Sequence, residues 1–333
     1  MIRRNTTHLR LSVGFNWTKF VLLSAALFVC TTLRAQSLGY EGPTGVFVTP
    51  LASTAASPAN GFGKPSVSFH FLNGGDVLGN FSTVSITEGV AKRFEFGYTA
   101  EFHSEGSDGT NAVNLSPLWT GTMSIVHGKA NIIPENAGKT KWVPAVSVGA
   151  IGRFNDNNVG DGTNSAALHS ALSITNGTQT KSNADFYIVG TKVVTQITKK
   201  VPWLLNFGVR GTNASLWGLG GNAPDYSARA FGAIAWVFTG PGKSTIILAS
   251  EVAQQPQHLL VTLSGSNTKV GVFDIPTSEV YAVRVVPSPK TKLNLDFGVL
   301  QAAGNIGASP TLPSVDVNLK ARARIAFALS YGF

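Results

Sequence analysis

The sequence is poor in charge, in cysteine and in long apolar runs, and each shortage excludes a class of protein. Charged residues make up 13% of the chain, about half the share of an ordinary soluble domain. No run of 18 or more uninterrupted apolar residues occurs, which argues against a membrane protein built from helices. The histidines show no metal-ligand spacing, and no nucleotide-binding glycine motif or helical DNA-reading motif is present. We therefore expect no metal, no cofactor and no nucleic acid partner.

The first 36 residues have the pattern of a secretory signal peptide. An apolar run over residues 20–30, too short to span a bilayer, is followed by a cleavage site after Ala35. Four basic residues precede the run: Arg3, Arg4, Arg10 and Lys19. The alternative is a short anchor that stays attached. A lipoprotein anchored through Cys30 is disfavoured, because Val29 stands where a small residue is needed.

Removal of this segment changes the charge and the cysteine count. Five of the 26 basic residues and none of the 17 acidic residues lie in it, so the net charge falls from +9 to +4. The basic excess is therefore largely a targeting signal and does not indicate nucleic-acid binding. Cys30 is the single cysteine, so the mature chain has neither a disulfide nor a cysteine-ligated metal site.

What the sequence has in abundance is alternation. Over residues 94–103, apolar side chains (Phe94, Phe96, Tyr98, Ala100, Phe102) alternate with polar or small ones, which is the period of a strand. Residues 320–333 alternate in the same way and end on Phe333. Strands this long are typical of transmembrane barrels, whose strands need about 9–11 residues, whereas globular strands average about 5–6.

Twelve such strands are predicted, and the connections between them alternate in length. The strands are 65–72, 80–90, 94–103, 119–132, 142–154, 184–197, 202–212, 227–239, 244–253, 278–286, 292–302 and 320–333. Each short turn, such as 91–93 or 239–243, is followed by a longer connection, such as 104–118 or 254–277. Short periplasmic turns, long outer loops and an even strand count are properties of outer-membrane barrels. An extra short strand around Leu259-Leu260-Val261 is left open.

The predicted organisation is a signal peptide over 1–36, a segment rich in Gly and Pro over 37–64, and an antiparallel up-and-down barrel over 65–333. The 37–64 segment is expected either at the periplasmic mouth or folded into the lumen. Tryptophans fall near predicted strand ends, as an interfacial belt requires: Trp142, Trp203 and Trp236 at the periplasmic end, and Trp119 and Trp217 at the outer end.

If the apolar faces point to lipid, the polar faces line the lumen. The candidate lumen-lining residues are Glu95, Glu101, Lys129, Arg153, Arg210, Arg229, Glu251, Arg284, Asp296, Arg322 and Arg324. Charges in a narrow lumen tend to pair, because an unpaired charge away from bulk water is costly. Two interpretations follow: a salt-bridged interior that stiffens and partly closes the barrel, or a charged constriction that selects solutes. Because basic residues outnumber acidic ones, a channel would lean toward anions.

An enzymatic role finds little support. The nearest candidate for a Ser–His pair of a lipid hydrolase is His103-Ser104-Glu105. Neighbouring residues in a strand point to opposite faces, so His103 and Ser104 would not form such a pair unless the strand ends there. We expect no catalytic residues.

Several motifs resemble a known family. The strand–turn–strand segment 84–98, with Phe94-Glu95-Phe96-Gly97, and the segment Leu293-Asn294-Leu295-Asp296-Phe297-Gly298 resemble outer-membrane β-barrel transporters linked to phenol meta-cleavage pathways. Glu88 departs from that pattern, where an aromatic residue is usual. The resemblance implies a barrel in the outer membrane and uptake of aromatic or other hydrophobic compounds. The closing Tyr331 and Phe333 resemble the assembly signal of such barrels.

These observations predict a channel or transporter for small solutes in the outer membrane of a Gram-negative-type bacterium. Its expected partners are outer-membrane lipid, the barrel-assembly machinery and small solutes. The alternative is a structural or adhesion barrel whose outer loops, 155–183 and 254–277, bind a partner. A lipid-modifying enzyme and a soluble periplasmic β-protein are more distant alternatives.

Overall fold

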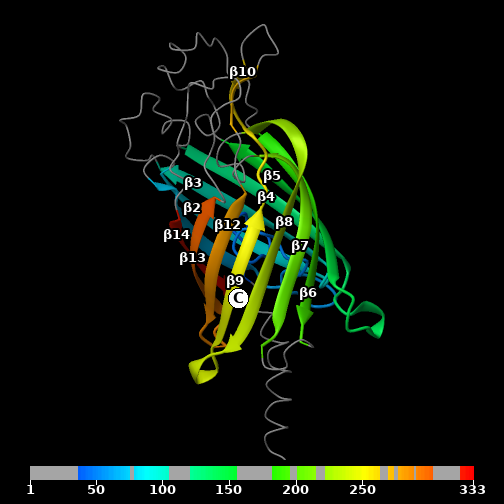
Figure 1. Cartoon of the computed structure of the whole chain (residues 1–333). Coiled ribbons are helices and arrows are strands. Elements are labelled where there is room, and N and C mark those ends of the chain that lie inside the picture. The colour runs from blue at the N-terminus through cyan, green and yellow to red at the C-terminus, as the bar shows by residue number, and fades with distance from the viewer. Residues whose placement is uncertain are drawn as a thin grey trace, which may run out of the picture. The chain divides into compact units, whose positions relative to one another are not determined.

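The computed structural model describes residues 37–75, 79–104, 121–155, 182–195, 201–214, 222–262, 269–273, 277–288, 290–302 and 323–333. The predicted signal peptide and the tryptophans Trp119 and Trp217 lie outside these residues. Twelve of the fourteen described strands form one closed antiparallel barrel (Figure 1). They are β1 (Ser66–Asn73), β2 (Asn80–Val90), β3 (Phe94–Ser104), β4 (Gly121–Ile133), β5 (Ala145–Asn155), β6 (Ser182–Val194), β7 (Trp203–Ala214), β8 (Asn222–Thr239), β9 (Thr245–Ala253), β12 (Ser278–Val286), β13 (Leu293–Ala302) and β14 (Arg324–Gly332).

The barrel closes between its first and last strands. Each strand pairs with its neighbour in sequence, apart from the step from β9 to β12, and β1 pairs antiparallel with β14 from Ser66↔Gly332 to Leu72↔Ala326. Closure leaves no strand edge unpaired in the barrel, which is the condition for a sheet to exist in a medium without water. β1 therefore starts, and β14 ends, at the end of the barrel that carries the short turns. We call this end the turn end and the opposite one the loop end.

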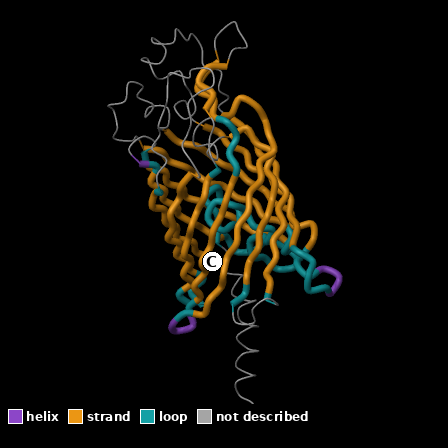
Figure 2. Tube along the Cα trace, in the orientation of Figure 1, coloured by secondary structure: helices purple, strands orange, loops and turns teal. Residues whose placement is uncertain are grey.

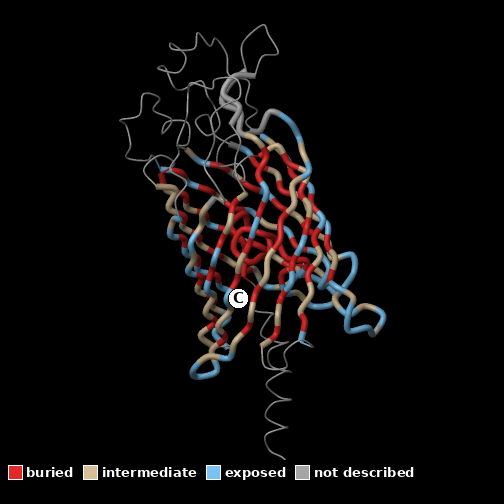
Figure 3. Tube along the Cα trace, in the orientation of Figure 1, coloured by how far each residue is buried: buried red, intermediate tan, exposed pale blue. Residues whose placement is uncertain are grey.

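The faces of the strands follow the predicted alternation (Figure 3). On β3, Phe94, Phe96 and Phe102 are 52%, 45% and 48% exposed on the outside, whereas Glu95 and Glu101 are buried inside. The last strand repeats the pattern, with Ile325, Leu329 and Tyr331 outside and Ala326, Ala328 and Ser330 inside. An apolar outer wall around a polar interior is the inverse of a soluble protein and is the arrangement of outer-membrane barrels.

The connection between β2 and β3 is a tight turn of three residues, 91–93. Ala91 and Lys92, between β2 and β3, both have positive φ, at 51° and 57°. Two consecutive positive φ values belong to the turn whose twist matches that of paired strands. The turn joins Val90 to Phe94, which pair with each other across the hairpin.

The strand boundaries differ from the predicted ones at a few ends. β5 begins at Ala145 instead of residue 142, because Pro144 has no amide hydrogen to give to a ladder. Trp142 therefore lies in the connection before β5, where it is 69% exposed, and the prediction that it begins a strand is wrong. β8 starts at Asn222, five residues early, across an irregular register near Thr212.

The open question in the 254–277 connection is answered by two short strands. β10 (His258–Thr262) and β11 (Lys269–Phe273) pair antiparallel and form a separate two-stranded sheet. This hairpin sits between the ends of β9 and β12, at the loop end (Figure 1). Two 3-10 turns, η2 (Ala137–Lys139) and η5 (Pro241–Lys243), lie at the turn end (Figure 2). Among the described residues, no helix is both long and apolar enough to cross a membrane.

Candidate functional site: a plugged lumen

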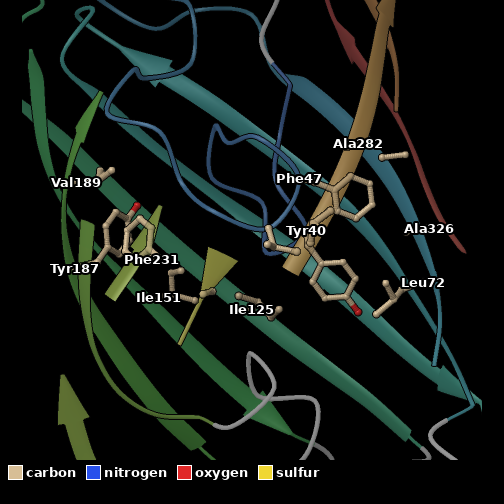
Figure 4. Close-up of a cluster of buried hydrophobic side chains, with 14 of the residues drawn as sticks. Tyr40, Phe47, Leu72, Ile125, Ile151, Tyr187, Val189, Phe231, Ala282 and Ala326 are labelled. Carbon is tan, nitrogen blue, oxygen red and sulfur yellow. The ribbon is translucent and has the colours of Figure 1, made fainter. Parts of the chain in front are cut away.

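The segment before the first strand folds into the lumen. Residues 37–52 are buried throughout, and with the residues up to Ala56 they form what we call the plug. In Figure 2 the plug is the irregular chain inside the strands. Tyr40 and Phe47 pack on the inner wall beside Leu72, Ala282 and Ala326 (Figure 4), and all five side chains are almost fully buried. Of the two locations expected for this segment, the lumen is the one observed for the plug; residues 58–62 are exposed.

The middle of the plug wraps around the carboxylate of Glu251, on β9. Its oxygens accept hydrogen bonds from the backbone amides of Phe47 (2.7 Å), Val48 (3.2 and 3.3 Å) and Thr49 (2.7 Å). The hydroxyl of Thr49 donates another at 2.5 Å. Consecutive backbone amides that converge on one anion form a nest. Glu251 is 1% exposed, so these charge-assisted bonds replace its hydration.

A second carboxylate holds another part of the plug. Glu95, on β3, accepts hydrogen bonds from the amide and hydroxyl of Thr44 (2.9 and 2.6 Å) and from the amide of Ala55 (2.7 Å). Lys129 on β4 pairs with Glu95 at 2.7 Å. It also donates to the carbonyls of Thr44 (3.1 Å) and Leu51 (2.9 Å). The ion pair therefore binds the plug with both of its charges.

A third group of charges joins the plug to β5, β6 and β7. Arg153 pairs with Glu41 of the plug and with Asp185 (2.8 Å). Arg210 pairs with the same two carboxylates, at 2.9 Å and 3.4 Å. Arg153 is completely buried. Two cations facing two carboxylates make a neutral network in which the plug supplies one of the four charges.

The remaining contacts tie the plug to other strands of the barrel. Arg284 on β12 forms a two-pronged pair with Asp296 on β13 and donates to the carbonyl of Val46. Ser37 lies within hydrogen-bond distance of Asp296 (3.3 Å) and Ser330 (3.4 Å). Further bonds reach the plug from Ser147, Thr191 and Asn206. Besides the apolar contacts of Tyr40 and Phe47, the plug is therefore held through polar groups that point inward from many strands of the wall.

The plug also places the phenol of Tyr40 in the interior, where it is almost fully buried. Burial raises the pKa of Tyr40 well above its ordinary value, with the nearby carboxylate of Glu101 adding to the shift. Tyr40 is therefore neutral at any physiological pH. Its ring lies edge-on to His70, with the ring centroids 6.0 Å apart.

The structure places the predicted lumen residues as follows. Seven of them contact the plug directly: Glu95, Lys129, Arg153, Arg210, Glu251, Arg284 and Asp296. Glu101 is buried and pairs with His103. Arg229 lies directly across from Arg210 and donates to Ser227 at 3.0 Å. The Arg324 guanidinium lies beside Gly75 at the loop end. Arg322 lies outside the described residues.

Several residues that hold the plug were not predicted. Glu41, Thr44 and Thr49 lie in a segment with no periodicity, and nothing in its composition indicates which wall residue each contacts. Asp185, on β6, was missed although it lies on the inner face of its strand and is fully buried. The alternation of the sequence could have identified Asp185, because this charged residue alternates with the apolar Phe186 and Ile188, which lie on the outside.

The histidine and serine considered for hydrolysis, His103 and Ser104, lie on opposite faces of β3. His103 is buried inside the barrel, whereas the neighbouring Ser104 is exposed and lies near the carbonyl of Asn80 (3.4 Å). No group of three or more metal-binding side chains is found in the part of the chain that the structure describes.

The fold and the lumen together define a closed twelve-strand antiparallel barrel of the outer-membrane type, filled by its own N-terminal segment. Residues 40–274 match the model of a family described as a protein of unknown function, DUF3034, and the chain belongs to this family. The family suggested by the motifs was a different one, and the outer-membrane-type barrel is the part of that prediction that stands.

Solved barrels resemble the chain distantly. The NanC porin, in a rhombohedral crystal form, is 9% identical, with 81% of this chain and 98% of the porin covered at a TM-score of 0.40. The β domain of the Bordetella autotransporter BrkA is 12% identical, with coverages of 82% and 100% and a TM-score of 0.35. Among curated proteins, none matches the sequence.

Proposed function

We propose that the chain is an outer-membrane barrel that carries small solutes, and that the plug is its gate. The observation that carries the proposal is the occupied lumen, in which Glu95, Glu251 and the Arg153 network bind the plug between residues 41 and 55. The exposed apolar wall supports insertion in a bilayer, and the short turns support a periplasmic position for the turn end. Outer-membrane lipid and the barrel-assembly machinery are the partners that this location requires.

The polar attachment of the plug supports a gate more than a permanent core. Most of its anchors are hydrogen bonds and ion pairs that water can replace once the plug leaves, unlike buried apolar contacts. Departure of the plug removes Glu41 from the network, which leaves Arg153 and Arg210 facing Asp185 alone. Glu251 loses its plug donors at the same time, so the anion preference is proposed for the part of the open lumen beside β5 and β7. Aromatic or hydrophobic compounds are the substrate class that the motif resemblance implies, and benzoate combines both properties.

A reversible lock tests the gate. The chain from residue 36 has no cysteine, so Ser37→Cys with Ser330→Cys introduces one disulfide where the hydroxyls are 3.4 Å apart. The lock is combined with Glu95→Gln and Glu251→Gln, and benzoate entry into liposomes is measured. We expect entry after reduction and none while the disulfide is closed. Equal entry in both states would contradict the proposal.

A second function is favoured by the β10–β11 hairpin, which extends the loop end. In this alternative the barrel is a closed support, and the hairpin with the 155–183 connection binds a partner at the cell surface. Deletion of residues 258–273 separates the two functions. If the barrel is a closed support, the deletion should abolish cell adhesion or partner binding. If the plug is a gate, the deletion should leave benzoate entry unchanged.

A further inference from the structure

A groove of about 750 Å³ lies in the outer wall between β3 and β7. Its outward-facing lining contains large side chains at the two sides, Phe94 on β3 and Phe186 on β6, which are 52% and 62% exposed. Its floor is formed by Gly128, Ala130 and Ala150. A side chain added at Gly128 would meet nothing closer than 3.9 Å. The volume is within the range of about 300–1,000 Å³ that is typical of ligand pockets.

The register shows that the lining residues of the groove are neighbours across five strands. Phe94, Ala130, Val148, Ile188 and Val209 are successive cross-strand partners from β3 to β7. The next row along the strands, from Gly128 through Ala150 to Phe186, runs parallel to it. Because this surface faces hydrocarbon in an inserted barrel, its occupant is an apolar chain.

A fixed cation stands at the turn end of the groove. Arg93 directly precedes Phe94, and its guanidinium donates to the backbone carbonyl of Asn131 at 3.2 Å and to the side-chain oxygen of Asn131 at 3.4 Å. Asn131 directly follows Ala130 of the groove floor. These bonds use one nitrogen of the guanidinium, and the planar fork has further donors suited to a phosphate. Lys92, in the same turn, and Lys141, in the connection between β4 and β5, are also exposed.

The charge of the turn end points to an anionic ligand. The five turns at this end, 91–93, 134–144, 195–202, 240–244 and 287–292, contain nine basic residues and one acidic residue. The six connections at the loop end, 74–79, 105–120, 156–181, 215–221, 254–277 and 303–323, contain four basic and seven acidic residues. Exposed aromatic residues, Trp142 among them, accompany the cations, as they do at a membrane–water interface. Basic clusters at that depth attract anionic lipid headgroups.

We propose that the groove binds an acyl chain of an anionic phospholipid whose phosphate lies on Arg93, with Lys92 and Lys141 beside it. The inference rests on the proposed insertion in the outer membrane, and the lipid comes from the leaflet that surrounds the turn end. A lipid held there would cover the wall behind which Glu95 and Lys129 bind the plug, since both residues also line the groove.

Native mass spectrometry of the chain from residue 36 in detergent tests the site, with phosphatidylglycerol or phosphatidylcholine added. One phosphatidylglycerol is expected to stay bound. Ala150→Leu fills the floor and Arg93→Gln removes the phosphate contact, and each is expected to weaken retention roughly five-fold. The matched controls are Ser250→Leu, outward on β9, and Lys243→Gln, in the β8–β9 turn; both should retain the lipid.

Three results would overturn the lipid site: unchanged retention in both groove variants, equal losses in the controls, or equal retention of phosphatidylcholine. Insertion is followed separately, by the heat-dependent gel shift of the same variants in vesicles. If the chain inserts and opens on release of the plug but retains no phosphatidylglycerol, the lipid site alone is wrong. If the chain does not insert, the proposed function is wrong.

Discussion

At the residue scale, the interior depends on a few buried charges that would be costly without their partners. Glu251 is the clearest case, because its partners are backbone amides of the plug and not a cation. A buried carboxylate needs several donors to replace its hydration. The plug supplies these donors, so the wall residue and the plug stabilise each other.

Glu251→Gln should loosen the 47–49 nest. The amide side chain has one acceptor oxygen and no charge, and loss of a charge-assisted bond costs about 1.5–3 kcal/mol. Hydrogen exchange of the Phe47, Val48 and Thr49 amides should therefore accelerate by roughly 10- to 100-fold. The control is Glu279→Gln, on β12, whose carboxylate contacts Tyr281 and Gln301 away from the plug. Equal exchange in both variants would show that Glu251 does not hold the segment.

Arg153→Met should destabilise the barrel strongly. It leaves Glu41 and Asp185 with Arg210 as their shared cation, and removal of one partner from a buried ion pair costs about 3–5 kcal/mol. The midpoint of urea unfolding in detergent measures the loss. Adding Glu41→Gln removes the excess negative charge and should restore part of the stability. A double variant that is destabilised, relative to the unsubstituted chain, by the full sum of the two single effects would contradict this coupling.

At the element scale, the strands could be predicted and the plug could not. The alternation on β3 and β14 is a local property, because each side chain faces either the apolar surroundings or the interior. It therefore predicted twelve strands and the inward direction of residues such as Lys129 and Arg153. The plug has no repeating pattern, and its path is determined by distant partners such as Glu251, more than 200 residues away. Only the folded barrel brings Glu251 and the 47–49 amides together.

The chain that leads from the plug to β1 passes close to Gly89, on β2, where there is no side chain. A methyl group at Gly89, on β2, would stand 2.0 Å from the carbonyl oxygen of Ala55, so Gly89→Ala must displace the plug. Overpacking of this kind costs about 1–3 kcal/mol. Limited proteolysis should cut near Ala55 faster in this variant. Gly190→Ala, where the nearest atom is 3.8 Å away, should not change the rate, and equal cleavage in both would exclude a tight fit.

The terminal aromatic pair has a structural position that fits a role in assembly. Phe333 is 52% exposed, and its ring meets Tyr331 edge-on with centroids 5.1 Å apart. Because it covers little of the interior, Phe333→Ser should lower the amount of heat-shiftable barrel in cells with little change in refolded stability. Phe297→Ser, another outward phenylalanine at 59% exposure, is the matched control. Equal losses in cells would contradict an assembly signal.

At the scale of the whole molecule, the barrel combines an apolar wall with an interior that its own chain neutralises. The predicted alternatives for the lumen were a paired interior or a charged constriction, and the structure shows pairing of Lys129, Arg153, Arg210 and Arg284. The predicted excess of basic residues is offset by Glu41, from the plug, and by Asp185. The sequence therefore predicted the wall of the site, while the segment that fills it required the folded chain. Anion preference stays a prediction for the open barrel.

Planar-bilayer conductance shows whether residues 37–56 close the lumen. The chain from residue 36 is compared with a chain from residue 57, after both have shown the heat-dependent shift of a folded barrel. We expect no sustained current for the longer chain and discrete, anion-selective steps for the shorter one. Identical steps from both chains, or no current through a folded barrel that lacks the plug, would contradict this expectation.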